Sequence, residues 1–149
     1  MGIFMKPCAV ARISGNGDNP ALCGKATFTQ KGSCVLVEVR VSGLPKENLS
    51  GFFALHIHEG VDCTGAGFVN SGGHYNPQMQ QHPNHAGDLP PLLSCGGSAY
   101  LCVCTDRFCV RDIIGKTIVI HSGADDFRTQ SAGNAGEKIA CGVICSAAQ

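Results

Sequence analysis

Hydrophobic and polar positions alternate in short runs along the chain, and glycine, proline, asparagine and aspartate separate the runs. In the clearest run, valine occupies every second position from Val35 to Val41. Because successive side chains of a β-strand point to opposite faces, this period of two predicts a strand with one buried face. The pattern predicts strands at residues 8–13, 24–30, 34–41, 52–58, 99–104, 116–121 and 138–145.

Residues 59–98 have almost no periodic pattern and contain many of the glycines and prolines. A loop of this length in a compact domain is usually functional. We find no convincing helix, repeat or domain boundary, and we therefore expect one domain over residues 1–149. Strands at this spacing predict an all-β sandwich or barrel.

The charge balance narrows the classes of partner. Eleven basic and eleven acidic residues cancel, which argues against non-specific binding to nucleic acid or to a membrane surface. No apolar run is long enough to cross a bilayer, and residues 1–7 do not have the pattern of a signal peptide. Ten cysteines without a C-x-x-C pair argue against a zinc ribbon or a disulfide-dense scaffold.

All six histidines lie at the ends of predicted strands or in the long segment between strands. His56 and His58 are two residues apart on a predicted strand, so both rings project to one face and could reach one metal ion. His74 follows two glycines, which let the backbone turn sharply. His121 ends an apolar run, where a buried histidine of purely structural role is the simpler interpretation.

A third group of possible ligands falls at intervals of three residues. His82, His85 and Asp88 would share one face of a helix, but Pro83 and Gly87 argue against a helix. In a loop these side chains could surround a small cation, and histidine with aspartate suits zinc. Each histidine taken singly has an ordinary structural explanation. The whole set is harder to explain in that way, because no histidine is left over.

Five motifs, in this order, resemble the copper/zinc superoxide dismutase family, and the resemblance covers nearly the whole chain with a bacterial character. The motifs are GFFALHIHE at 51–59, GGHYNP at 72–77, HAGDLP at 85–90, IIGKTIVIH at 113–121 and GNAGEKIACGVI at 133–144. The resemblance implies an eight-stranded Greek-key barrel or sandwich, immunoglobulin-like, with long metal-binding loops. The family is a known example of the sandwich architecture and of electrostatic focusing of a charged substrate.

The resemblance also implies an activity and a set of roles. The activity is dismutation of superoxide to dioxygen and hydrogen peroxide, and the oxidoreductase would cycle copper beside a structural zinc ion. His74 would bridge both metals and carry a proton, and Asp125 would orient one ligand at each metal. The implied copper ligands are His56, His58, His74 and His121, and the implied zinc ligands are His74, His82, His85 and Asp88.

Two features depart from the family's usual pattern. Lys138 occupies the place of an arginine that guides the anion to copper, and lysine keeps the charge but loses the planar, two-pronged donor group. We therefore expect activity to be retained but reduced. His82 and His85 are close together, and the segment 122–137 is short, so a site that holds copper alone stays open.

The resemblance pairs Cys63 with Cys141 in a disulfide. The other eight cysteines have no family role; Cys102 and Cys104 would share a strand face and could acquire copper, although core packing is the expected role of such residues. Many unpaired thiols favour a reducing, cytoplasmic compartment, and export with a signal peptide absent from this sequence is the alternative.

Two other functions remain as alternatives. A protein of the same fold could store or carry copper and zinc without turnover, and Lys138 with the short loops favours that interpretation. An interaction module with fortuitous histidines is the third, and the complete ligand set argues against it. Superoxide is the expected substrate and a homodimer is possible.

Overall fold

The computed structural model describes residues 5–147. Residues 1–4 and 148–149 lie outside the described residues. Two expectations fall partly on them: that residues 1–7 are not a signal peptide, and that the domain runs from residue 1 to residue 149. The extent of that domain, 1–149, therefore stays a prediction. No helix in the described part of the chain is both long enough and apolar enough to cross a membrane.

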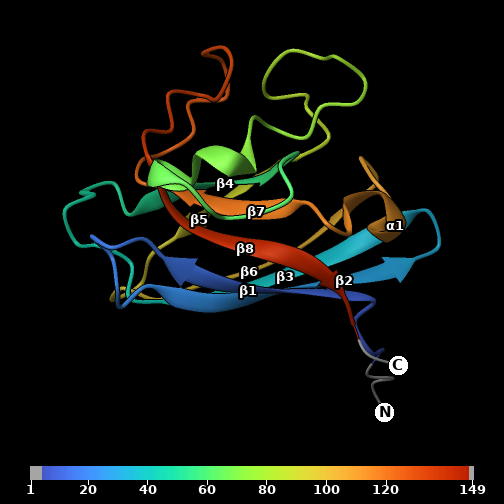
Figure 1. Ribbon diagram of the computed structural model, residues 1–149, viewed down its shortest axis with the longest axis horizontal. Helices are drawn as coiled ribbons and strands as arrows, with labels where there is room; N and C mark the ends of the chain where they lie inside the picture. The colour runs from blue at the N-terminus through green and yellow to red at the C-terminus, as the bar shows by residue number, and fades with distance from the viewer. Residues whose placement is uncertain (1–4, 148–149) are drawn as a thin grey trace.

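Eight antiparallel strands form a nearly closed barrel, as the resemblance implied (Figure 1). The strand order is β5-β4-β7-β8-β1-β2-β3-β6, so chain neighbours β3 and β4 are separated and β6 pairs with β3. The edge strands β5 and β6 approach each other and nearly complete the barrel. The bounds are β1 (Ala9–Gly15), β2 (Cys23–Lys31), β3 (Cys34–Ser42), β4 (Phe52–His58), β5 (Asp88–Leu93), β6 (Ala99–Thr105), β7 (Thr117–His121) and β8 (Lys138–Ser146).

The barrel interior is the hydrophobic core, and the period of two places its residues there. The valines of β3 from Val35 to Val41 are all buried, which confirms the strand and its inward face. On β4 the inward residues are Phe53, Leu55 and Ile57, and they belong to the same core. The alternate positions on β4 therefore face outward.

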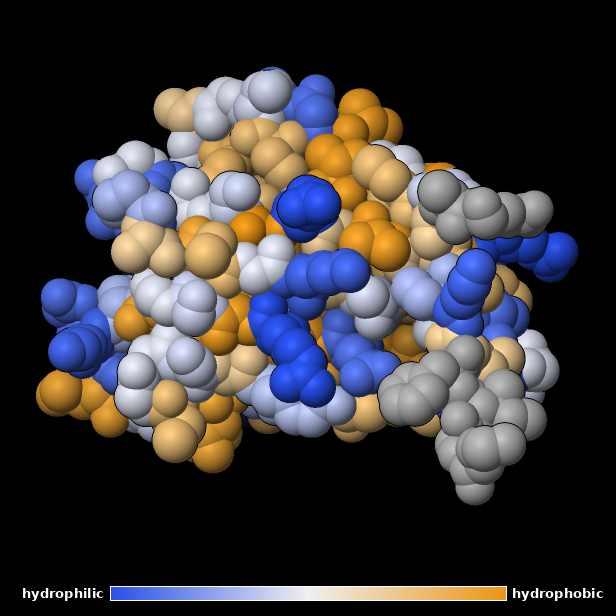
Figure 2. Space-filling model, turned by 90° about the horizontal axis from the view of Figure 1, so that it is seen from below, coloured by the Kyte–Doolittle hydropathy of each residue, from blue (hydrophilic) through white to orange (hydrophobic). Residues whose placement is uncertain are grey.

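Two halves of the barrel differ in what covers their outer surface. On the half made by β1, β2 and β3, the side chains of Arg12, Lys25 and Arg40 lie opposite one another in register and are exposed. Figure 2 shows hydrophilic side chains gathered on this face of the molecule. The outer faces of β4 and β7 are instead buried, because the loops 59–87 and 122–137 cover them (Figure 1).

One strand and two helices were missed by the sequence prediction. Residues 88–93 form β5 although they include Pro90 and Pro91, which argued for a loop. β5 is an edge strand whose one partner is β4, and the register between the two strands shifts at the prolines, so neither proline is paired with a residue of β4. The 3₁₀ helix η1 (Ala66–Ser71) and the helix α1 (Val110–Ile113) contradict the expectation of no helix. Both are too short to produce a helical period in the sequence.

Neighbouring phenylalanines on β4 provide a matched test of the core. Phe53 is completely buried whereas Phe52 is 41% exposed. Replacement Phe53→Ala removes a core side chain and leaves a cavity, and we expect it to lower the free energy of unfolding by about 3–5 kcal/mol. Urea unfolding followed by circular dichroism measures this change. Phe52→Ala is the control and should lose much less; equal losses would contradict the assigned inward face.

Candidate metal centre

All six histidines are buried in one region between the outer face of the barrel and the two covering loops. His56 and His58 are outward residues of β4, and His121 ends the adjacent strand β7. His74 comes from the long loop, and its backbone pairs with that of His58 in an isolated antiparallel β-bridge. The structure thus brings together residues 56, 58, 74 and 121.

The Nε2 atoms of His58 and His121 face each other, and neither carries a hydrogen that it could donate to the other. His58 Nδ1 lies 2.8 Å from Gly72 O and His121 Nδ1 lies 3.2 Å from Gly136 O, so each Nδ1–H donates to a carbonyl. The two Nε2 atoms are then left as acceptors and lie 3.2 Å apart. Two lone pairs at this distance repel unless a cation or a proton lies between them.

The nearby rings of His56 and His74 add two more unshared nitrogens. His56 Nε2 donates to Asp125 Oδ2 at 2.8 Å, which leaves Nδ1 as the acceptor. Within residues 5–147, His56 Nδ1 and His74 Nε2 are buried and have no hydrogen-bond partner. Ligand atoms of His56, His58, His74 and His121 all lie within 4.8 Å of one another. Four imidazole nitrogens suit Cu(II), and the donor set therefore fits that ion.

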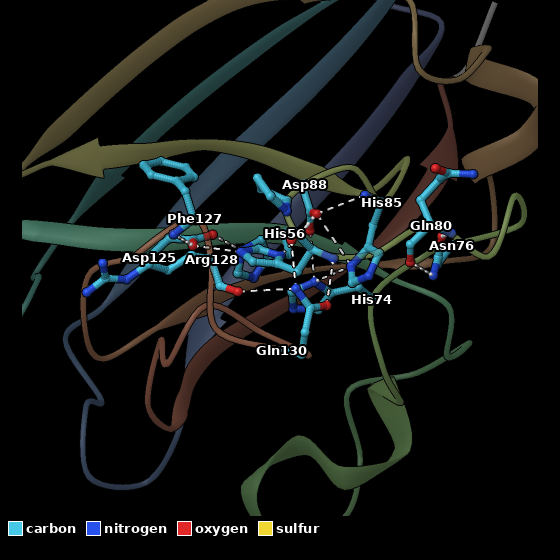
Figure 3. Close-up of polar contacts among 12 residues, drawn as sticks. His56, His74, Asn76, Gln80, His85, Asp88, Asp125, Phe127, Arg128 and Gln130 are labelled. Carbon is cyan, nitrogen blue, oxygen red and sulfur yellow. Dashed lines mark hydrogen bonds and ion pairs between the residues drawn. The ribbon is translucent and has the colours of Figure 1, made fainter.

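A second set of ligand atoms surrounds the carboxylate of Asp88 (Figure 3). His74 Nδ1 lies 2.8 Å from Asp88 Oδ1, and the Nδ1 atoms of His82 and His85 lie 3.0 and 3.4 Å from Asp88 Oδ2. Ligand atoms of His56, His74, His82 and Asp88 all lie within 4.8 Å of one another, so His56 is as close to this carboxylate group of ligands as to the first set. His85 also lies against this set, with its Nδ1 3.1 Å from His74 Nδ1. Three imidazoles and one carboxylate fit a tetrahedral zinc site.

Asp125 connects the two sets of ligands (Figure 3). Its two oxygens accept hydrogen bonds from His56 Nε2 at 2.8 Å and from His82 Nε2 at 2.7 Å. Burial alone would raise the pKa of Asp125, but these bonds and one from the backbone N–H of Phe127 hold the pKa well below its usual range. A side chain at Gly133 would collide with Asp125 Oδ1 at 2.0 Å, and the φ of +69° there also favours glycine.

Burial keeps two of the histidines uncharged. Together with smaller effects of neighbouring histidines and of Lys138, burial lowers the pKa of His58 to about 2 and that of His121 to about 3. A histidine must be neutral to offer a lone pair to a metal ion, so both rings are ready as ligands at neutral pH.

Comparison with known proteins agrees with this geometry. The sequence model described as copper/zinc superoxide dismutase matches residues 22–144. The chain is 35% identical over 136 residues to a Cu-Zn superoxide dismutase of Aquifex aeolicus, covering 81% of this chain and 78% of the relative. It is 35% identical over 142 residues to the enzyme of Legionella pneumophila, covering 90% and 85%. An extracellular Cu-Zn superoxide dismutase of Drosophila melanogaster is 36% identical over 156 residues, covering 91% and 83%.

The chain belongs to the copper/zinc superoxide dismutase family. Copper and zinc are the metals of this family, and both sets of ligand atoms described above suit them. The bacterial character of the motifs agrees with the relatives from Aquifex and Legionella.

Lys138 lies beside the histidines of this dismutase, at the start of β8 and opposite His121 in register. Its Nζ donates to Ser71 Oγ and Gly72 O, both at 2.8 Å, and lies 3.4 Å from Phe68 O. Burial lowers the pKa of its ammonium group. The lysine therefore ties β8 to the long loop, and its charge lies close enough to lower the pKa values of His58 and His121.

Cys63 and Cys141 form the disulfide that the resemblance implied. The bond joins the long loop to β8 across 78 residues, and closing a loop of that length stabilises the fold by about 4.5 kcal/mol on the chain-entropy account. The expectation that the other cysteines pack in the core is wrong. Cys102, Cys104 and four others are exposed, and two are partly exposed, because they occupy outward positions or loops.

One contact in this enzyme has no signal in the sequence. The side-chain amide of Gln130 accepts a hydrogen bond from His82 N–H at 2.9 Å and donates one to His82 O at 2.8 Å (Figure 3). An exposed glutamine 48 residues away in the chain has no local pattern that could identify this pairing.

Because the folded state excludes protons from His58 and His121, the metal-free protein should lose stability in acid. Their pKa values are lowered from 6.5 to about 2 and about 3, so the stability is complete above pH 6.5 and falls as the pH drops toward 3. Between pH 7 and 5.5 we expect a loss of roughly 1 kcal/mol for each of these histidines, measured by urea unfolding after metal removal.

A His58→Asn variant is the control for this pH dependence. It removes the contribution of the His58 ring, so the loss between the same two pH values should shrink by roughly 1 kcal/mol. Stability that is constant, or that rises toward pH 5.5, is incompatible with buried neutral rings.

Proposed function

We propose that the enzyme converts two superoxide anions and two protons into dioxygen and hydrogen peroxide. Copper would be held by His56, His58, His74 and His121, and zinc by His74, His82, His85 and Asp88. The observation that supports this most directly is the ring of His74. Its Nδ1 faces Asp88 and His85, and its buried Nε2 has no partner in the described part of the chain. One imidazole can therefore serve both sets of ligands.

Copper, when bound, supplies a redox couple that takes an electron from one superoxide and returns it to a second, beside the fixed positive charge of zinc. The residues of the chain provide the geometry and the proton. His74 Nε2 would carry one proton to the product, because Nδ1 stays fixed against Asp88 while Nε2 faces the copper ligands. Asp125 would hold His56 and His82 in the orientations that present their Nδ1 atoms.

Lys138 would attract superoxide toward the copper ligands. Lys138 is only partly buried and lies near His58 and His121, so its charge adds an attractive field for an anion beside the proposed copper ligands. Lysine cannot hold an anion with the two-pronged geometry of arginine, so we expect a reduced rate relative to an arginine-bearing enzyme. The non-catalytic alternative is not favoured, since the relatives are named as dismutases.

Three further expectations belong to this proposal. The whole chain would be one domain, and two copies would form a homodimer. A reducing, cytoplasmic location is supported by the exposed unpaired cysteines, although the relatives include both bacterial and extracellular enzymes.

Activity should depend on the copper ligands. Protein loaded with copper and zinc should dismutate superoxide, and His121→Asn should lower the rate at least 100-fold, because one of four nitrogens is lost and the coordination opens. Stopped-flow decay of superoxide, with metal content measured on each sample, gives the rates. Arg12→Ala, on the exposed face of β1, is the control and should match the wild type. A fully loaded wild type no faster than buffer would end the proposal.

The guiding role of Lys138 has its own test. Lys138→Ala should lower the rate by about tenfold, because an attractive charge is lost. The rate should also depend less on ionic strength, because the charge that salt would screen is no longer there. Lys138→Arg should keep the salt dependence and raise the rate above that of the wild type. Metal content is measured in each variant, since the lysine also binds Gly72 O near His74. An alanine variant with unchanged rate and salt dependence contradicts the role.

A further inference from the structure

The short segment 82–88 contains three of the four proposed zinc ligands and little regular structure. Only Asp88, at its end, belongs to a strand. Within the segment the backbone forms turns, in which Asn84 N–H donates to Gln81 O at 2.7 Å and Asp88 N–H donates to His85 O at 3.1 Å. Gly87 is also hydrogen-bonded to Ile57 and Tyr75, and Asp88 Oδ2 accepts from His85 N–H at 3.0 Å. Residues 82–85 have no backbone partner beyond their near neighbours among the described hydrogen bonds, so side chains from other parts of the chain must place them.

Arg107 makes such contacts from the connection between β6 and α1. Its Nη1 donates to Pro83 O at 2.8 Å and to His85 O at 3.1 Å, and lies 3.5 Å from Asp88 O. The guanidinium is planar, always charged and rigid, and hydrogen bonds from a charged donor are stronger than neutral ones. One nitrogen thus draws together carbonyls from both ends of the turn that precedes β5.

Gln130 holds the other end of the same segment through the backbone of His82 (Figure 3). The two side chains come from different loops and bind successive carbonyls, those of His82 and Pro83. The segment is therefore held from two directions. Among residues 5–147, the hydrogen bonds of the Arg107 side chain all go to this segment, and no ion pair engages it.

The charge of Arg107 and its hydrogen bonds predict opposite effects on zinc. A fixed positive charge near a dication repels it, so charge alone predicts that removal of Arg107 would tighten zinc binding. Placement of the ligand backbone predicts the reverse, because a metal site loses affinity when its ligands are free to move. The sign of the change therefore separates the two.

We propose that Arg107 is a positioning residue for the zinc site, which it supports by holding the backbone of His85 and of its neighbours in the turn. This inference rests on the proposed zinc ligands. Arg107 touches no ligand nitrogen or carboxylate oxygen in the described contacts, and it acts through the carbonyls it binds.

The test compares zinc affinity in four forms of the full-length protein: wild type, Arg107→Ala, Arg107→Lys and Arg111→Ala. Arg111 is the matched control, because it is an arginine four positions away whose side chain is 87% exposed and is 3.9 Å from Asp112. Competition with a chromophoric chelator gives the zinc Kd of metal-free protein. Cobalt(II) placed in the zinc site gives a visible spectrum that reports the ligand geometry.

We expect Arg107→Ala to weaken zinc binding by about tenfold and to alter the cobalt spectrum. Arg107→Lys should lie between, since it keeps a charged donor but not the planar group. Arg111→Ala should match the wild type in both measurements. A Kd in Arg107→Ala that equals the wild-type value, or is tighter, overturns the proposal.

Circular dichroism shows whether each variant folds. If Arg107→Ala does not fold, Arg107→Lys decides the question, and wild-type zinc affinity in that variant overturns the proposal. A wild type that binds no zinc and gives no cobalt spectrum is a different result: it removes the proposed ligand set, and this inference with it.

Discussion

The rest of this structure depends on one buried interaction, the close approach of histidine ring nitrogens that have no hydrogen to share. His58 and His121 each donate one N–H to a backbone carbonyl, so their remaining nitrogens face each other as acceptors at 3.2 Å. A buried polar atom without a partner costs free energy, and two facing lone pairs add repulsion. Burial also lowers the pKa of both rings, so a proton does not resolve the conflict at neutral pH. A cation does.

The barrel supplies a rigid base for this arrangement. Outward positions of β4 and the end of β7 present three histidines, while their inward neighbours pack in the core. A sheet face normally exposes such residues to water, but here two loops cover it. The disulfide between Cys63 and Cys141 and the hydrogen bonds of Lys138 tie the long loop to β8. The ligands therefore stand on a strand framework and are enclosed by tethered loops.

Carbonyl and carboxylate acceptors decide which nitrogen each ring presents. Gly72 and Gly136 fix His58 and His121, and Asp125 fixes His56 and His82 with its two oxygens. Because one carboxylate holds a ring in each set, a displacement of Asp125 would disturb both sets together. Gly133 makes room for that carboxylate, since any larger side chain would overlap it. The orientation of the ligand rings thus depends on groups that are not themselves proposed metal ligands.

The sequence by itself determined seven of the strands, the buried face of the strand that carries Val35 to Val41, and the placing of histidines at strand ends and in the long loop. These features follow from the period of two and from residue type, which are local. The motif resemblance added the family, the disulfide and the expected division of the ligands into a copper set and a zinc set. The tertiary structure alone decided that the two prolines of β5 lie in an edge strand, that Cys102 and Cys104 face outward, and that Gln130 and Arg107 hold the turn of His82 and His85. Those outcomes depend on contacts between residues distant in the chain, and no local pattern in a sequence records which acceptor a distant side chain will reach.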